Sequence, residues 1–129
     1  MKALRYLWAF PATLPGLLFA LLGALTGGQA RLVDGVVEAH GGVVTALLRT
    51  KIPFFGSGAA LTLGHVILGR DQHCLDRSRP HEHVHVQQYE RWGPLLIPLY
   101  LIASLRAWNR GLDPYLDNPF EQEAFSREP

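Results

Sequence analysis

The chain has 129 residues, of which 12 are Lys or Arg and 11 are Asp or Glu, so its formal net charge is +1. That length allows one small domain with a limited hydrophobic core. The balanced charge, without a basic stripe interleaved with aromatic residues, argues against nucleic acid as a partner. The single cysteine, Cys74, excludes an internal disulfide framework and a zinc site built from several cysteines.

The first feature along the chain is a stretch without charged residues, from Tyr6 to Ala30. It follows Lys2 and Arg5 and is long enough to cross a bilayer, which requires about 20 apolar residues. We interpret residues 1–30 as a retained membrane or membrane-surface segment, which predicts a protein located at a membrane. A cleaved signal peptide with secretion is the second interpretation, and a buried core helix is the third.

Residues 31–68 have the composition of short β-strands joined by turns. Two Val-rich stretches, R-L-V-D-G-V-V-E-A-H and G-V-V-T-A-L-L, are separated by glycines. A Pro- and Gly-containing loop is expected at residues 53–58, and A-A-L-T-L-G-H-V-I-L-G then predicts a strong strand. The polar run 71–78 predicts an irregular connection. His40 and His65 lie in these β surroundings and are interpreted as hydrogen-bonded structural residues.

The stretch R-P-H-E-H-V-H-V-Q-Q-Y-E-R-W, residues 79–92, contains the pattern H-E-x-x-H at His81, Glu82 and His85. On a helix, positions i and i+4 lie on one face, so both imidazoles can bind one metal ion. Glu82 then lies beside the metal's open position. Two neutral nitrogen ligands and a carboxylate that takes a proton from water are the parts of a zinc hydrolase. The pattern makes His81 and His85 candidate ligands and Glu82 the candidate catalytic base.

Two other interpretations of this stretch remain open. His81, His83 and His85 alternate, so on a β-strand all three would share a face and could bind metal together. The flanking residues favour a helix, because Ser78 can cap it, Pro80 suits its first turn and a Gly-Pro pair ends it. A solvated, histidine-rich helix that binds no metal is the remaining alternative.

A shorter apolar run follows at residues 94–105, and after it come Arg106, Trp108 and Arg110. A run of this length is more typical of a core, re-entrant or interfacial helix than of a membrane span. The two arginines and the tryptophan fit a helix that ends near lipid headgroups. Gly111 is typical of the residue that follows a helix.

The tail, N-P-F-E-Q-E-A-F at residues 118–125, predicts a final helix. Asn118 is a good N-cap, Pro119 suits the first helical position, and Glu121 stands three residues after the cap. This spacing is also that of a capping box, in which Glu121 would only accept the Asn118 backbone N–H.

Together, H-E-x-x-H and the E-x-x-A of the tail resemble the zincin superfamily of metallopeptidases, within it small bacterial families of gluzincin type. The resemblance covers about residues 60–125. In such proteins a second helix with E-x-x-A supplies the third zinc ligand. The resemblance implies His81, His85 and Glu121 as ligands and Glu82 as general base.

Glu123 is the alternative third ligand, two residues after Glu121. The E-x-x-A likeness and the position at the start of the helix favour Glu121. The chain departs from the family pattern at Phe125, where an acidic or amide residue commonly supports a ligand histidine.

The expected architecture is α+β: an apolar segment at residues 1–30 and a zincin-like metal-binding domain at residues 31–129. That domain would hold short strands, the H-E-x-x-H helix, a hydrophobic helix and a Glu-bearing C-terminal helix. The expected function is hydrolysis of peptide bonds in a peptide or protein substrate, with Zn²⁺ as cofactor. An exposed sheet edge beside the cleft would pair with an extended substrate. The alternative is a catalytically inactive zinc-binding protein that acts as a membrane-associated scaffold or sensor.

Overall fold

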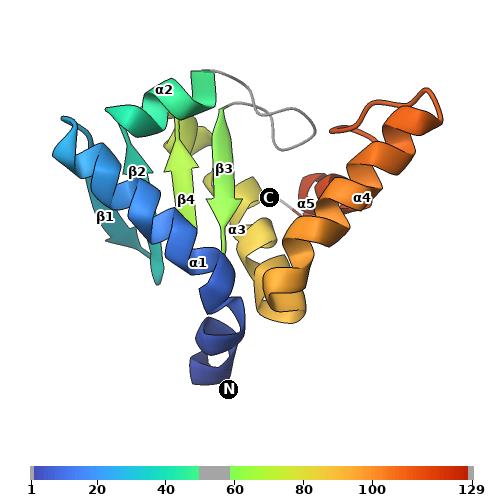
Figure 1. Ribbon diagram of the computed structural model, residues 1–129, viewed down its shortest axis with the longest axis horizontal. Helices are drawn as coiled ribbons and strands as arrows, with labels where there is room; N and C mark the ends of the chain where they lie inside the picture. Colours follow the sequence, from blue (N-terminus) through green and yellow to red (C-terminus); the bar gives the residue numbers. More distant parts are fainter. Residues whose placement is uncertain (1, 50–58, 128–129) are drawn as a thin grey trace.

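The computed structural model describes residues 2–49 and 59–127, which form an α+β fold, as expected. Figure 1 shows α1 (Lys2–Leu25) and α2 (Val43–Arg49) covering one face of a small sheet, while α3 (Gln72–Trp92) lies against the other face. The loop expected at residues 53–58 lies outside the described residues.

The sheet has four strands in the order β1–β2–β4–β3. β1 (Gln29–Val33) and β2 (Val36–His40) are antiparallel, and β2 runs parallel to β4 (Val66–Gly69). β3 (Ala60–Leu63) pairs antiparallel with β4 and forms one edge. The stretch predicted as one strong strand is therefore a hairpin. Gly64, with φ of 60°, occupies its two-residue turn, where a positive φ favours glycine.

One stretch predicted as a strand is a helix instead. Most of G-V-V-T-A-L-L forms α2, because Val44 and Leu48, one helical turn apart, both bury their side chains in the core beside the sheet. The Thr45 hydroxyl also accepts the Gly41 N–H at 3.0 Å and donates to the Arg70 carbonyl at 2.8 Å. Packing against the sheet here outweighs the strand preference of valine.

Side chains that alternate along the strands fill a separate core on each face of the sheet. On the α1 face the core consists of Ala20, Ala39, Val44, Leu48, Leu61, Leu63, Val66 and Leu68. On the α3 face it consists of Val36, Ala60, Ile67, Leu75 and Val86. Glu38 also faces α3, where its carboxylate accepts hydrogen bonds from Arg79 at 2.7 and 2.8 Å. These contacts fix the position of α3 beside β3.

α1 packs through small, buried residues: Gly16 and Ala20 lie on the sheet, and Ala9 and Ala12 lie against Tyr89 of α3 and Leu96. A Cβ added at Gly16 would lie 2.8 Å from the Cβ of Val66, so only glycine permits this approach. Residues Ala3–Leu25 form the one described helix that is long and apolar enough to cross a membrane. A membrane span, a signal sequence and a core helix are all compatible with that length and composition.

The histidine-bearing stretch is a helix, as predicted, so the interpretation as an alternating strand is wrong. The helix begins earlier than expected, because the Asp71 carboxylate caps it by accepting the Cys74 N–H at 2.7 Å. The predicted irregular run 71–78 therefore supplies the cap and the first turns of α3, and Ser78 is not its cap. Pro80 lies inside the helix, and Gly93 ends it with φ of 60°.

Two further helices complete the fold. The short turn η1 (Gly93–Leu95) leads into α4 (Leu96–Asn109), and α5 (Pro119–Arg127) follows a loop. α5 begins where predicted, since the Asn118 Oδ1 accepts the Phe120 N–H at 2.9 Å. The Asn118 side-chain amide also donates to Ser104 Oγ at 2.8 Å, which joins α5 to α4.

Candidate metal centre

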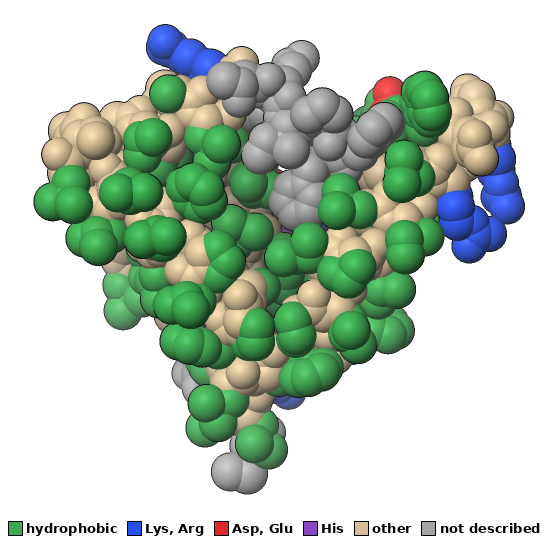
Figure 2. Space-filling view, viewed as in Figure 1, with side chains coloured by type: hydrophobic (Ala, Val, Ile, Leu, Met, Phe, Trp, Pro, Cys, Tyr) green, Lys and Arg blue, Asp and Glu red, His purple; other side chains and the backbone are tan. Residues whose placement is uncertain are grey.

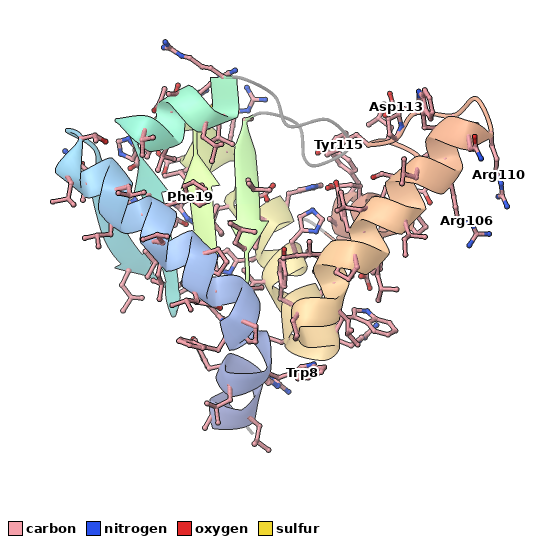
Figure 3. All side chains as sticks on the ribbon, in the orientation of Figure 1. Trp8, Phe19, Arg106, Arg110, Asp113 and Tyr115 are labelled. Carbon is pink, nitrogen blue, oxygen red and sulfur yellow. The ribbon has the colours of Figure 1, made fainter. Side chains whose placement is uncertain are left out.

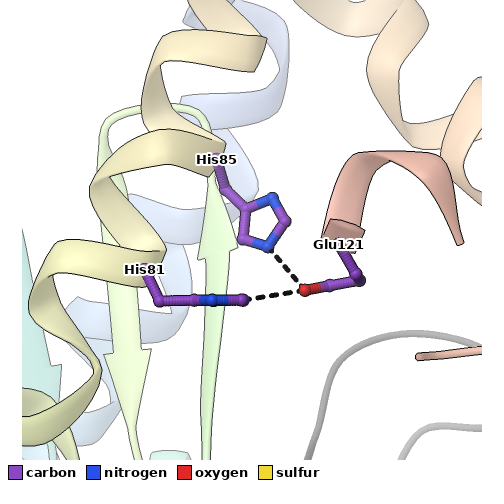
Figure 4. A group of neighbouring side chains, drawn as sticks. All are labelled: His81, His85 and Glu121. Carbon is purple, nitrogen blue, oxygen red and sulfur yellow. Dashed lines mark hydrogen bonds and ion pairs between the residues drawn. The ribbon is translucent and has the colours of Figure 1, made fainter. Parts of the chain in front are cut away.

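The structure brings His81, His85 and Glu121 together, although about 40 residues separate the glutamate from the first histidine. The Oε1 atom of Glu121 lies 2.8 Å from the Nε2 atom of His81 and 3.0 Å from the Nε2 atom of His85 (Figure 4). The candidate ligand atoms all lie within 4.8 Å of one another, and all three residues are buried. Two imidazoles on α3 and one carboxylate on α5 thus converge on one point.

Glu121 does not form the capping box that its spacing also allowed. Its Oε1 atom faces the two histidines, and its Oε2 atom accepts the Tyr100 hydroxyl at 2.5 Å. The Asn118 N–H instead donates to the Tyr115 carbonyl at 3.3 Å. Asn118 caps α5 by itself, and the Glu121 side chain is directed to α3 and α4.

Glu82 lies next to this cluster but is not part of it. Its Oε1 atom accepts the hydroxyl of Thr62, on β3, at 2.8 Å, and the side chain is buried. The carboxylate lines a cavity between β3, α3 and α4, whose other lining residues are Ala60, Leu61, Thr62, His85, Tyr89, Leu96, Tyr100, Tyr115 and Glu121. A small molecule or a chain segment in this cavity would therefore meet Glu82 and the His–Glu cluster together.

The remaining candidates lie away from the cluster. His83 is on another face of α3, and it does not belong to the one group of metal-binding side chains found among the described residues. Glu123 accepts the side-chain amide of Gln88 at 2.7 Å and pairs with Arg127 at 3.4 Å. Its carboxylate therefore serves the contact between α3 and α5.

Gln88 is a site residue that the sequence analysis missed. Its Oε1 atom lies 2.8 Å from His85 Nδ1, and its amide nitrogen donates to the Phe120 carbonyl at 2.9 Å as well as to Glu123. A protonated Nδ1 that donates to Gln88 directs Nε2 toward the cluster. The spacing of three residues from His85 on one helix was the available sequence signal.

Gln88 thus supplies an amide acceptor to a candidate ligand histidine, which Phe125 cannot do. The Phe125 ring instead packs on His81, with a distance of 4.4 Å between the ring centroids. Tyr100 was also missed, because only the tertiary structure brings α4 to Glu121. Its hydroxyl and the Gln88 amide orient one ligand each, from two different helices.

Without a metal, protons bridge these side chains. Burial lowers the pKa of His85, but the hydrogen bond to Glu121 and the negative charges of Glu82 and Glu121 outweigh it and raise the pKa to about 9. Burial raises the pKa of Glu121, but hydrogen bonds from His81 and His85 outweigh it and lower the pKa to about 2. The directions of these two pKa shifts favour an ion pair between the His85 imidazolium and the Glu121 carboxylate.

The donor set fits Zn²⁺. Two imidazole nitrogens and one carboxylate oxygen are ligands of catalytic zinc sites, and they leave a fourth position open. Tetrahedral zinc with bonds of about 2.0–2.2 Å holds its ligand atoms roughly 3.3–3.5 Å apart. The present separations of 2.8 and 3.0 Å between Glu121 Oε1 and the two histidine nitrogens would have to widen by roughly half an ångström.

Comparisons of the chain with protein families, with curated proteins and with solved structures found no match. A functional assignment therefore rests on the chemistry of this centre.

Proposed function

We propose that the protein is a zinc-dependent hydrolase of peptide bonds that belongs to the zincin-like proteins and is held at a membrane by its apolar α1. One observation carries the proposal: two histidines and a glutamate converge in a buried centre, with a separate carboxylate, Glu82, at the wall of the adjoining cavity. A structural zinc site would have four protein ligands, whereas three ligands and a free carboxylate suit catalysis.

Zinc held by His81, His85 and Glu121 would supply Lewis-acid chemistry to a carbonyl group and a water molecule. Glu82 would accept a proton from the water as its oxygen bonds to the peptide carbonyl carbon, and would pass that proton to the amine that leaves when the C–N bond breaks. Burial raises the pKa of Glu82, which makes its carboxylate a stronger base than an exposed one. The hydrogen bond from Thr62 holds one of its oxygens on the side of β3.

The edge strand β3 supports an extended peptide as the substrate. The register pairs Leu61 with Leu68 and Leu63 with Val66, and the two-residue turn makes Leu63 and Val66 a hydrogen-bonded pair. The backbone groups of Ala60 and Thr62 therefore point away from β4. Both residues line the cavity that Glu82 lines, and there the Thr62 carbonyl accepts the Tyr89 hydroxyl at 3.1 Å. A peptide added at this edge would be held by its main chain next to the centre.

The test combines metal analysis of the purified protein with hydrolysis of a peptide library. We expect about one zinc per chain, lost in His81→Ala and His85→Ala and retained in the matched control His83→Ala. Glu82→Gln should retain zinc and the fold but lose hydrolysis. Zinc binding by an unmodified protein that cleaves no peptide would favour the alternative, a scaffold or sensor. Absence of zinc under all loading conditions would refute the proposal altogether.

A further inference from the structure

The distribution of side chains around α1 is the reverse of that around a helix on the surface of a water-soluble protein. The small residues of α1 face the sheet, α3 and α4, and most of its large apolar residues face outward. Leu7 and Leu25 are 68 % and 73 % exposed, whereas Ala9 and Ala12 are buried. A helix surrounded by water normally directs its leucines to the core and polar residues to the solvent. The outward side of α1 is therefore suited to an apolar environment.

α4 continues the same surface, which we call the apolar face. Of the 20 large hydrophobic side chains that are exposed in the described residues, 10 belong to α1 and 5 to η1 and α4. They are Leu4, Leu7, Trp8, Phe10, Leu14, Leu17, Leu18, Leu21, Leu22 and Leu25, together with Leu95, Leu101, Ile102, Leu105 and Trp108. Figure 2 shows hydrophobic side chains spread over both arms of the V that α1 and α4 form in Figure 1.

Basic side chains lie at the margins of the apolar face. In Figure 2 the Lys and Arg side chains appear at its edges, and Figure 3 places Arg106 and Arg110 at the outer end of α4. Both arginines are exposed, and Trp108 lies between them in the sequence. At the other end of the face, Trp8 on α1 donates its indole N–H to the Arg91 carbonyl at 3.2 Å. Tryptophan and arginine around an apolar area are typical of a membrane–water interface.

We propose that the apolar face rests on a phospholipid bilayer, with α1 and α4 parallel to the membrane surface and neither helix crossing it. The leucines of both helices would enter the acyl boundary, and Arg106 and Arg110 would meet anionic headgroups. This inference specifies how the proposed membrane location is achieved, but it depends on neither zinc binding nor hydrolysis.

A membrane-spanning α1 conflicts with its contacts, which run along most of its length. The Tyr6 hydroxyl donates to the Gly35 carbonyl at 2.8 Å, and the Thr13 hydroxyl accepts the His65 N–H at 3.0 Å. Near the other end, a Cβ at Gly23 would lie 2.8 Å from Val44. A spanning α1 would therefore carry the sheet into the hydrocarbon. The open edges of a sheet are not tolerated there, because no water satisfies their backbone groups.

A bilayer suits this face better than a second copy of the chain. No Asp or Glu occurs from residue 6 to residue 33 or from residue 91 to residue 112, so α1 and α4 offer no acids to pair with the marginal arginines. In a face-to-face dimer these arginines would have to be neutralised from other elements. Anionic headgroups instead complement the basic margins at the depth where the apolar side chains end.

The first experiment measures binding of the full-length protein to vesicles by flotation. Vesicles of phosphatidylcholine, with and without one third phosphatidylglycerol, should both bind the protein, the anionic ones more tightly. Ile102→Glu and Leu105→Glu replace exposed side chains and should each weaken binding by at least about tenfold. Arg77→Gln, an exposed position on α3, is the control with the same change in net charge and should bind normally. Arg106→Gln should weaken binding only to anionic vesicles, by roughly fivefold.

The second experiment determines whether α1 crosses the bilayer. Single cysteines at Arg5 and Gln29, introduced with Cys74→Ser, are labelled in intact cells with a membrane-impermeant maleimide. Both ends should be on the same side of the membrane, and labelling on opposite sides would refute the proposal. Unchanged vesicle binding by Ile102→Glu would also refute the proposal. It would be refuted as well if the unmodified protein bound no vesicles and formed a dimer that Ile102→Glu abolished. Zinc content measured on the same variants separates these outcomes from failure of the proposed hydrolase function.

Discussion

Replacement of Gln88 by methionine tests whether the candidate metal centre depends on the hydrogen bond between Gln88 and His85. Gln88 is buried, and its Oε1 atom lies 2.8 Å from His85 Nδ1. Methionine has a similar volume and leaves no large cavity, but it removes the acceptor for Nδ1. We expect zinc affinity to fall by roughly 10–100-fold, as is usual when the support of a ligand histidine is lost. This corresponds to about 1.4–2.7 kcal/mol of binding free energy.

The same substitution should affect the metal-free protein as well. The part-buried Phe120 carbonyl and the buried His85 Nδ1 each lose a partner, and such losses cost about 1–3 kcal/mol of unfolding free energy. Zinc affinity is measured by competition with a chromophoric chelator, and stability by equilibrium unfolding in the presence of excess chelator. Measuring zinc affinity and stability on the same variant distinguishes misorientation of His85 from loss of the fold.

Two further variants provide the controls. Gln88→Glu retains an oxygen that can accept His85 Nδ1–H, so it should restore zinc affinity relative to Gln88→Met. It should nevertheless be less stable than the unmodified protein, because it places a second carboxylate beside Glu123. Glu123→Gln keeps the Gln88–His85 contact and should bind zinc within about twofold of the unmodified protein. Unchanged affinity in Gln88→Met, or an equal loss in Glu123→Gln, would show that Gln88 does not orient His85.

Three other predictions follow from the structure. Glu121→Ala should strip the zinc from the protein, whereas Glu123→Ala should keep it with modest destabilisation; metal analysis of the two variants checks this, and retention by Glu121→Ala would remove Glu121 from the site. Arg79→Ala should lower the free energy of unfolding by about 3–5 kcal/mol in denaturant titrations, because it leaves the fully buried Glu38 carboxylate without its partner. Zinc at a hundred times its dissociation constant should raise the free energy of unfolding by about 2.7 kcal/mol over the chelated protein, and His81→Ala should show no such increase.

The sequence alone determined the features that depend on short spacing. The spacing of four from His81 to His85 places both imidazoles on one helical face, and Asn118 with Pro119 defines the start of α5. The uncharged run from Tyr6 to Ala30 likewise indicated an apolar helix. These local patterns depend on backbone geometry within one or two turns, which is why they could be predicted without the fold.

The tertiary structure decided which contacts form between segments that are distant in the sequence. The valines of α2 form a helix because Val44 and Leu48 pack beside the sheet, a contact that overrides their strand preference. The earlier start of α3 depends on Asp71 as its cap, and its position on the sheet depends on the ion pair between Arg79 and Glu38.

The centre itself shows the same division. The Asn118-x-x-Glu121 spacing allowed capping and the E-x-x-A likeness implied ligation, and the Glu121 side chain is directed to the histidines because Tyr100 and the docked α3 surround it. Tyr100 contacts Glu121 from a separate element, which no spacing along the chain encodes. Gln88 has a three-residue spacing from His85 on α3, but its contacts with Phe120 and Glu123 of α5 fix the direction of its side chain. Side-chain direction across a helix–helix interface depends on how the helices pack, and packing is a property of the whole fold.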